Sequence, residues 1–598
     1  MRSVNILFLT KGFTFIESLV GVAVFMIIAG SIYQSYTVAI NVIRNSRLKI
    51  TATALANEQF EIVRNLPYSD VGIVSGLPAG KIPLSQSLTR DGTIFVVLAT
   101  IRNIDDPFDG TFGGAPNDLS PADHKLVEIT IKCPTCQRFL PLRFTTRVSP
   151  RALESASMNG ALFIHTFDEA GLPVMGADVQ IVDTAPAFII NDTTNNQGLL
   201  QVVDAPPGFQ TYQINVSKPG YSTDQTYTVG AVDNPNPTKP HATVVTQALT
   251  EISFAIDKTS TINASTINTI CAAIPDINFS LIGTKLIGTI PDVIKYTASH
   301  TTDGAGKKTI ANLEYDTYNI AIANAVYDLR GTIPLLPMAL HANITQDLKL
   351  ILAPKDPQTL FVIVKDSATQ LPLSDVSVQL QQGMAYDVTL ITGQGFMLQT
   401  DWSGGPGQTD FINPSKYFSD DGNIEVAIPP GDLRLRKIFG IYAPSGILTS
   451  STFDPGAISN FRQILWQPQS QAVETGPDSI RFQIATNNDN ATWNFLGPDG
   501  TGATYYTLAS QNINPIHNAT RYLRYKIFLQ TADTQWTPII SDISFTYTSS
   551  CLPPGQVSFN GLDAGNYTIT VSKIGYTTFT ETISLSSPWE QKEVILAP

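Results

Sequence analysis

Apolar residues follow two patterns along this chain. Near the front, the stretch from Ser18 to Ile43 is uncharged, lacks proline and is rich in Val, Ile, Ala and Phe. About 20 consecutive apolar residues are enough to cross a bilayer as a helix, so this stretch predicts a membrane-spanning segment. Later apolar residues recur at helical spacing or alternate with polar ones, which predicts amphipathic elements with one buried face.

The residues that follow the apolar stretch continue the helix in amphipathic form. Between Arg44 and Leu66, polar residues separate apolar positions at roughly helical spacing: Ile50, Leu55, Phe60, Ile62, Val63 and Leu66. Such a face should pack against a globular domain. Proline pushes the preceding residue out of the helical region, so Leu66-Pro67 ends the helix. The sequence therefore predicts one helix over 13–66, with its first half in the membrane.

Alternation predicts a small sheet directly after this helix. Residues 92–101, 125–132 and 142–148 alternate apolar and polar side chains, as half-buried strands do. We expect residues 67–156 to form a small antiparallel sheet domain that packs on the helix.

Internal repeats organise the rest of the chain. The segment 161–181 has an echo at 359–380, the segment 207–221 returns at 564–576, and two copies end in Ile-Leu-Ala-Pro. Short alternating strands between Gly, Asp and Pro turns predict β-sandwiches. The expected sandwiches span 157–249, 250–356, and 357–387 together with 551–598.

The last repeat is split by a long insertion. Residues 388–550 separate its opening strands from its closing strands and carry alternating segments of their own, 479–486 and 521–529 among them. Loop tips tolerate inserted domains, and this length suits one. We expect a further β-sandwich there, of lectin-like or discoidin-like type by analogy alone. The predicted fold class is mainly β, with a long N-terminal helix, a small α+β head and a string of β-sandwiches.

The start of the apolar stretch carries a specific motif, Lys11-Gly12-Phe13-Thr14-Phe15-Ile16-Glu17. An acid at the head of a hydrophobic segment is costly in lipid and is a functional candidate by default. The alternatives are an ordinary signal anchor and a secretory signal peptide, which would be cleaved beyond the apolar stretch at a small-residue site. No such site stands out there.

This motif resembles the amino terminus of type IV pilins and pseudopilins, and the likeness covers residues 1–65. The resemblance implies a leader, 1–12, that a prepilin peptidase removes by cutting between Gly12 and Phe13. It also implies N-methylation of Phe13. Glu17 would then be the assembly carboxylate, which neutralises the new terminal amine of a neighbouring subunit.

The repeated phrases resemble carboxypeptidase-regulatory-like domains, which are transthyretin-like β-sandwiches of many surface proteins. The shared order is a strand, a proline-containing turn, Gly-Ala-x-Val, a turn rich in Thr, Asp and Gly, and a strand that ends near Gly-Tyr. This resemblance implies a fold and no peptidase activity.

Composition narrows the function further. With 598 residues, the chain is too long for a single core. A net charge of −13 argues against nucleic-acid binding by the chain as a whole. The six histidines are scattered, and the common nucleophile, zinc and phosphate-loop motifs are missing from the sequence. We therefore expect a protein that is not an enzyme and uses no cofactor.

The four cysteines leave several alternatives open. Cys133 and Cys136 lie between two predicted strands, where they could form a local disulfide, hold a metal or act in redox chemistry. A zinc site would need further ligands, of which His124 is one candidate. Cys271 and Cys551 could pair across domains in an extracellular compartment, or remain two buried thiols.

Four tryptophans fall in the insertion: Trp402, Trp466, Trp493 and Trp536. Their faces could stack on sugars or anchor a protein interface. The alternative is core packing, because tryptophan is highly buried on average.

Two classes of function fit these observations. The first is a large minor pilin or pseudopilin, a filament subunit that displays β-sandwiches for surface adhesion. Its partners would be the prepilin peptidase, other pilins, the inner-membrane assembly platform and a glycan or protein ligand. It would lie in the cytoplasmic membrane with its C-terminal domains outside, and later in a filament. The second is a membrane-anchored binding protein that never assembles. Pilus, type II secretion and DNA uptake are not separated by the sequence.

Overall fold

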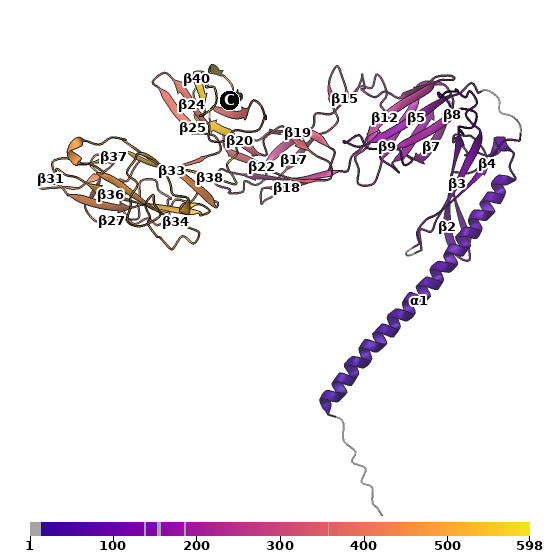
Figure 1. Ribbon diagram of the computed structural model, residues 1–598, viewed down its shortest axis with the longest axis horizontal. Coiled ribbons are helices and arrows are strands. Elements are labelled where there is room, and N and C mark those ends of the chain that lie inside the picture. Colours follow the sequence, from indigo (N-terminus) through magenta and orange to yellow (C-terminus); the bar gives the residue numbers. More distant parts are fainter. Residues whose placement is uncertain (1–13, 137–138, 152–156, 185–186, 357) are drawn as a thin grey trace, which may run out of the picture. The chain divides into compact units, whose positions relative to one another are not determined.

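The computed structural model of the protein describes residues 14–136, 139–151, 157–184, 187–356 and 358–598. One long helix at the front is followed by sheets alone, apart from three short 3₁₀ turns among these residues (Figure 1). The mainly β fold class is thus confirmed. The chain forms two compact units, Met1–Asp257 with Ile287–Val293, and Lys258–Leu286 with Ile294–Pro598.

The helix α1 spans Phe15–Arg64, close to the range expected from the sequence. Every buried residue of α1 lies in its second half: Ala52, Leu55, Ala56, Gln59, Phe60 and Val63. The amphipathic part therefore packs as predicted, whereas the apolar first half is exposed along its whole length. The 3₁₀ turn η1, Tyr68–Asp70, follows the proline that ends the helix.

A four-stranded antiparallel sheet holds the second half of α1. Its order is β1-β2-β3-β4, and the strands are β1 Ser85–Arg90, β2 Thr93–Ile104, β3 His124–Lys132 and β4 Leu142–Val148. Leu55 and Phe60 of the helix share a core with Phe95 and Ile129 of the sheet. This head domain fixes the direction in which α1 leaves it (Figure 1).

The first sandwich packs a three-stranded sheet, β12-β5-β8, on a second sheet, β10-β9-β6-β7, with β11 beside β9. Its strands are β5 Gly160–Phe167, β6 Asp178–Thr184, β7 Ala187–Thr193, β8 Leu199–Ala205, β9 Gly208–Ser217, β10 Asp224–Gln225, β11 Ala242–Val244 and β12 Leu249–Ala255. Because β12 pairs in parallel with the opening strand β5, the sandwich extends beyond the expected boundary at residue 249.

The second sandwich repeats this plan with sheets β18-β13-β22-β20 and β17-β14-β19-β21, and adds the hairpin β15-β16. Its strands are β13 Ser260–Ile267, β14 Asn278–Ile282, β15 Leu286–Gly288, β16 Val293–Ile294, β17 Thr297–Thr301, β18 Lys307–Leu313, β19 Asp316–Ile322, β20 Tyr327–Ile333, β21 Met338–Leu340 and β22 Thr345–Pro354. The opening strand β13 again pairs in parallel with the closing strand, here β22.

The third sandwich is assembled from two separated parts of the chain. Its sheets are β39-β23-β42 and β25-β24-β40-β41. The strands are β23 Thr359–Asp366, β24 Ser377–Gln382 and β25 Tyr386–Ile391, then β39 Gln556–Phe559, β40 Gly565–Ser572, β41 Phe579–Leu585 and β42 Trp589–Leu596. Strand β25 extends this sandwich past the expected boundary at residue 387, because it pairs with β24 along its whole length.

The insert between β25 and β39 is a domain with its own core. Its main sheets are β26-β38-β33-β35 and β27-β32-β36-β34, with β28-β29-β37 and β30-β31 beside them. The elements are β26 Gly395–Gln399, β27 Ser419–Asp420, β28 Ile424–Ala427, β29 Pro430–Leu435, β30 Lys437–Ile438, β31 Ile441–Tyr442, β32 Ser445–Thr449, β33 Ser459–Gln467, η2 Val473–Thr475, β34 Ile480–Asn487, β35 Ser510–Asn512, η3 Pro515–His517, β36 Tyr522–Gln530, β37 Ile539–Ile540 and β38 Asp542–Ser549.

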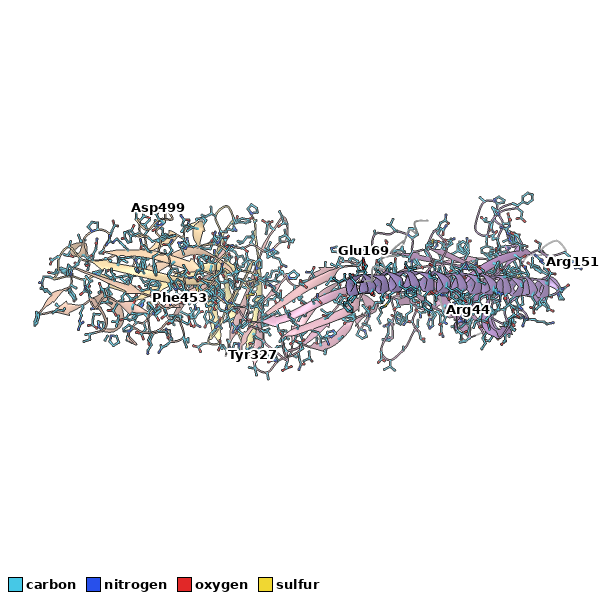
Figure 2. All side chains as sticks on the ribbon, turned by 90° about the horizontal axis from the view of Figure 1, so that it is seen from below. Arg44, Arg151, Glu169, Tyr327, Phe453 and Asp499 are labelled. Carbon is cyan, nitrogen blue, oxygen red and sulfur yellow. A yellow bond between two sulfur atoms is a disulfide. The ribbon has the colours of Figure 1, made fainter. Side chains whose placement is uncertain are left out.

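Aromatic rings fill this core. Phe453 lies inside the insert (Figure 2) and stacks on Phe411 with ring centroids 4.2 Å apart. The first strand, β26, pairs with the last strand, β38, so the domain closes on itself. Its entry and exit also meet, since a Cβ placed on Gly393 would lie 3.6 Å from the Cα of Pro554. Neighbouring ends are what an insertion at a loop tip requires.

Candidate functional site

The start of α1 is the first candidate site, and a capping box organises it. The backbone N–H and the hydroxyl of Thr14 each donate to Oε2 of Glu17 at 2.9 Å, and the Glu17 N–H donates back to the Thr14 hydroxyl at 3.3 Å. The Glu17 side chain is exposed, and a carboxylate is favoured at the positive end of the helix dipole. Gly12 and Phe13, the expected cleavage pair, lie outside the described residues.

The apolar half of α1 is unusual for its exposure. Phe15 is 82% exposed, and large apolar side chains stay exposed on all sides as far as Ile43. The helix is long and apolar enough to cross a membrane. Exposed apolar surface of this extent indicates a partner, either lipid or other helices.

Basic residues mark the end of this apolar surface. Arg44, Arg47 and Lys49 are the first charges after Glu17, and they precede the first buried position, Ala52. Figure 2 shows Arg44 on the helix. Long basic side chains at the end of an apolar segment reach water readily, so they suit a membrane boundary. The change from the exposed half of α1 to the packed half therefore takes about two helical turns, from Arg44 to Ala52.

The Cys133–Cys136 pair forms a disulfide directly after β3. Cys133 is buried in the core that the helix shares with the head sheet. His124, the extra ligand that a metal site would have used, begins β3 at its opposite end. Because a strand rises about 3.3 Å per residue, the length of β3 separates His124 from the two sulfur atoms. The disulfide therefore has a structural role, because it ties the residues after β3 to the core of the head domain.

Cys271 and Cys551 are also joined as a disulfide, which links the second sandwich to the end of the insert. Lys349 of β22 adds a polar contact across the same junction, since its ammonium donates to the carbonyl of Ser550 at 2.8 Å. Of the two alternatives that the sequence left open for these cysteines, the structure has the pairing across domains.

The four tryptophans of the insert differ sharply in burial. Trp402 is 0% and Trp466 is 3% exposed, and both belong to the core of the insert. The Trp402 indole N–H donates to the Tyr525 hydroxyl at 2.9 Å. These two side chains therefore pack the domain, and Trp466 also borders the cavity at the edge of this core. Trp493 is half-buried over the Arg524 guanidinium, and Trp536 is 47% exposed.

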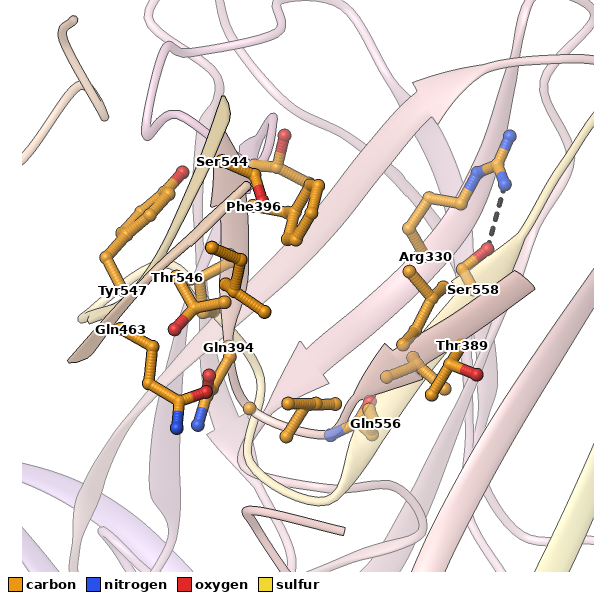
Figure 3. Close-up of a pocket in the computed structure, with 18 of the residues that line it drawn as sticks. Arg330, Thr389, Gln394, Phe396, Gln463, Ser544, Thr546, Tyr547, Gln556 and Ser558 are labelled. Carbon is orange, nitrogen blue, oxygen red and sulfur yellow. Dashed lines mark hydrogen bonds between the residues drawn. The ribbon is translucent and has the colours of Figure 1, made fainter. Parts of the chain in front are cut away.

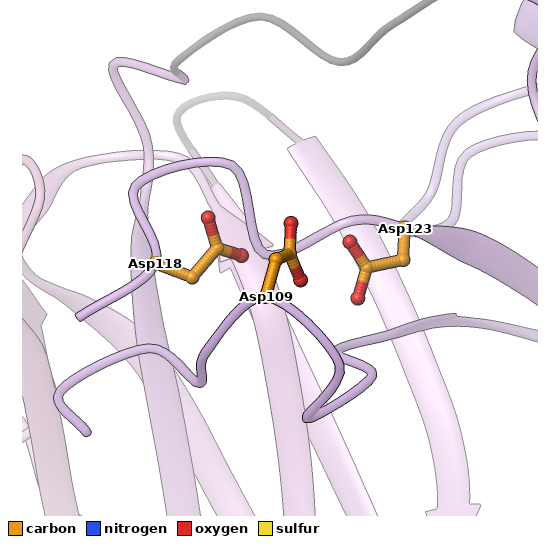
Figure 4. A group of neighbouring side chains, drawn as sticks. All are labelled: Asp109, Asp118 and Asp123. Atoms are coloured by element: carbon orange, nitrogen blue, oxygen red, sulfur yellow. The ribbon is translucent and has the colours of Figure 1, made fainter. Parts of the chain in front are cut away.

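A cluster of carboxylates in the head domain is the group best suited to a metal ion among the described residues. Asp109, Asp118 and Asp123 each bring one oxygen to within 4.8 Å of the others, and Figure 4 shows the three side chains in a row. Burial and the charges of these three groups raise the pKa of Asp105 beside them. Oxygen donors suit Ca²⁺. No further observation on the described residues points to an ion, since exposed acidic groups of this kind are common without one.

A cavity of about 640 Å³ lies at the junction of the insert with the second and third sandwiches, all within one unit. Strands β26, β33 and β38 of the insert form one wall. Phe396, Thr546 and Gln463 come from this wall, and Arg330 of β20, Thr389 of β25 and Ser558 of β39 face them (Figure 3). Sequence reasoning missed this site because its walls come from segments more than 200 positions apart.

Comparisons with known proteins do not assign this chain to a family. No protein-family model matches the chain, and no curated protein matches it either. Solved structures align with parts of it. The Bacillus anthracis TIE protein aligns at 14% identity over 52% of this chain and 55% of that one, with a TM-score of 0.15. A streptococcal ancillary pilin aligns at 10% identity over 38% and 76%, with a TM-score of 0.18.

GBS52, the minor pilin of Streptococcus agalactiae, aligns at 14% identity over 33% of this chain and 99% of that one, with a TM-score of 0.15. The chain spans about half the length of the Bacillus anthracis protein that it matches. At these identities and TM-scores, the assignment of function depends on the residues of this chain.

Proposed function

We propose that this chain is a filament subunit of the type IV pilin class, a large minor pilin or pseudopilin that is not an enzyme. One observation carries the proposal: α1 exposes its apolar first half completely, opens with the carboxylate of Glu17, and packs its second half on the head sheet. A helix of this kind can leave a bilayer only if other apolar helices replace the lipid around it.

In this proposal, Glu17 fixes the position of each helix along its neighbour in the filament. In the isolated chain its carboxylate bonds only to groups of Thr14 in its own capping box among the described residues. In a filament it would pair with the terminal amine of Phe13 on a neighbouring subunit, after a prepilin peptidase has removed residues 1–12. Removing one partner of a buried ion pair costs about 3–5 kcal/mol, which makes assembly sensitive to this single side chain.

The sandwiches would be the displayed part of the subunit. They follow the helix in the chain, and in this proposal they would lie outside the cytoplasmic membrane before assembly and on the filament afterwards. The partners in assembly would be other pilins and the inner-membrane platform, and the sandwiches would provide the surface for adhesion to a glycan or protein. A membrane-anchored binding protein that never assembles is the competing function.

Substitution of Glu17 separates these two functions. We expect Glu17→Gln to remain in the membrane fraction while its amount in the sheared surface fraction falls at least tenfold. Glu61→Gln is the matched control, because Glu61 is an exposed carboxylate of the same helix that pairs with Arg64. Sheared fractions with wild-type amounts of Glu17→Gln would reject the filament proposal in favour of the anchored binding protein.

A further inference from the structure

The cavity between the insert and the two neighbouring sandwiches has an unusual lining. Ser544 and Thr546 of β38 face away from the core of the insert, which takes Ile543, Phe545 and Tyr547 from the same strand. Both outward-facing residues are nevertheless buried, because the second and third sandwiches cover this face. The cavity thus borders a sheet face whose polar residues are buried, while Phe396 on the same face stays exposed.

Several buried polar atoms of this lining have no hydrogen-bond partner among the residues that the structure describes. They are Oγ1 of Thr546, which is 4% exposed, Nε of Arg330, which is 5% exposed, and Oε1 of the half-buried Gln394. An unsatisfied buried polar group costs about 1–3 kcal/mol, so buried polar groups are nearly always paired. All three atoms are shielded from the cavity as well as from bulk water, so the groups that can reach a ligand are the carboxamides and hydroxyls that line the cavity beside them.

The side chains that line the cavity define the chemistry of a ligand that would fit it. Carboxamides recur in the lining. The amides of Gln394 and Gln556 are already bonded to Asp375 and Thr332, and the others are Gln463, Gln467, Gln469 and Asn560. Thr389, Ser544 and Thr546 add hydroxyls. Carboxamides and hydroxyls both donate and accept hydrogen bonds, and so do the hydroxyls of a sugar. One cation, Arg330, and one anion, Asp542, also line the cavity, so the formal charges of the lining balance.

Phe396 supplies an aromatic face in the same place. Its side chain projects from β26 away from the core of the insert and is 53% exposed, and Figure 3 shows its ring between the two groups of polar side chains. A ring with a free face can pack against the apolar side of a sugar while hydroxyls at the rim bond to carboxamides.

We propose that this cavity binds a short neutral oligosaccharide. The proposal deepens the display role and rests on it, but it does not depend on filament assembly. A peptide is the competing ligand. Peptides that bind sheet proteins commonly add a strand to an open edge, and β20, β25, β26 and β39 around the cavity are edge strands. The side chains that line the cavity, carboxamides and hydroxyls beside the ring of Phe396, favour the sugar.

The Cys271–Cys551 disulfide holds the rim of the site. Thr269 and Leu552 both line the cavity, and each lies within two positions of one of the bonded cysteines. The bond thereby fixes the wall formed by the insert against the wall formed by the second sandwich. A rim held in this way keeps the site formed before the ligand arrives, which lowers the entropy lost on binding.

The test uses the purified full chain in a detergent without a sugar head group. The probe is a printed array of neutral and sialylated oligosaccharides together with a peptide panel, followed by calorimetric titration of the strongest oligosaccharide. We expect saturable binding to neutral oligosaccharides. Gln463→Leu keeps much of the volume of the side chain but removes the carboxamide that lines the cavity, and should weaken binding about tenfold. Phe396→Ala should weaken binding at least as much.

Leu398→Ala is the matched control, since Leu398 lies two positions further along β26 on the same face, is 43% exposed and does not line the cavity. Thermal unfolding of each variant shows that it is folded. An array without neutral ligands, a preference for peptides, or equal affinity of the three variants would overturn the proposal. Filament assembly, measured separately with Glu17→Gln, is unaffected by any of these outcomes.

Discussion

Cys271 and Cys551 are 280 positions apart in the chain, yet their disulfide ties the second sandwich to the last turn before the third sandwich resumes. Cys133 and Cys136, by contrast, are only 3 positions apart. The two bonds therefore constrain the unfolded chain to very different degrees.

The first prediction compares the loops that these disulfides close. In the chain-entropy treatment, stabilisation grows with loop length, to about 5 kcal/mol for the long loop and about 2 kcal/mol for the short one. The double variant Cys271→Ser with Cys551→Ser should lower the melting temperature of its unit by several degrees, and more than Cys133→Ser with Cys136→Ser lowers that of the head. Calorimetry measures both shifts, and a larger effect of the short bond would contradict this account.

His517 makes the stability of the insert depend on pH. Its side chain is 2% exposed, its Nδ1 lies 3.0 Å from the Thr486 hydroxyl, and burial lowers its pKa from 6.5 to about 4. The folded insert therefore disfavours the charged ring. The stability that the neutral ring provides is fully present above pH 6.5 and is lost progressively as pH falls toward 4, by up to about 3 kcal/mol.

The measurement is the urea midpoint of the insert between pH 7 and 4. His517→Gln should flatten its pH dependence in this interval. His165→Gln serves as the control, because the His165 side chain is 39% exposed and lies in the first sandwich. Identical slopes for wild type and His517→Gln would refute the role of this buried ring.

Tyr525 connects two buried side chains of the insert. Its hydroxyl accepts from the Trp402 indole and donates to Oε1 of Gln399 at 2.8 Å. Tyr525→Phe leaves both partners without a bond inside the core and should cost about 1–3 kcal/mol. Trp536→Phe, a change at the surface, should stay within about 0.5 kcal/mol. Chemical denaturation of both variants tests this difference, and equal effects would show that the buried network contributes nothing.

The mature amino terminus tests the proposed processing. In a host with a prepilin peptidase, intact-mass and peptide analysis of protein from the cell surface should find a chain that begins at a methylated Phe13. Substitution of Gly12 by a bulkier residue should leave the leader in place. Surface protein that still carries Met1 in that host would contradict the cleavage.

Much of the fold could be predicted because its signals are local. The uncharged stretch before Arg44 identifies the exposed half of α1, and the periodic positions from Leu55 to Val63 identify the packed half. The repeats indicated the sandwiches and the insertion, since each copy keeps its turn residues. The errors lie at domain edges. Strand β12 belongs to the first sandwich because it pairs with β5, and such long-range pairing leaves no trace in the sequence near residue 249.

The candidate sites were harder to anticipate. Trp402 and Trp536 look alike in the sequence, and only the packing of two sheets decides that one is buried and the other exposed. Phe396 is one apolar residue in an ordinary alternating strand, and its surroundings come from three domains. Cysteine partners likewise follow from the three-dimensional arrangement, because four cysteines allow three pairings.

The divided third sandwich sets an order of events during synthesis. Strand β23 cannot gain its parallel neighbour β42 until the whole insert and the final residues have left the ribosome. The insert, whose first and last strands pair with each other, is able to finish earlier. Because a contact between such distant segments forms slowly, the incomplete third sandwich exposes an unpaired strand edge in the meantime. Other strands could pair with this edge incorrectly. During synthesis that edge must therefore stay shielded until the last strand has been made.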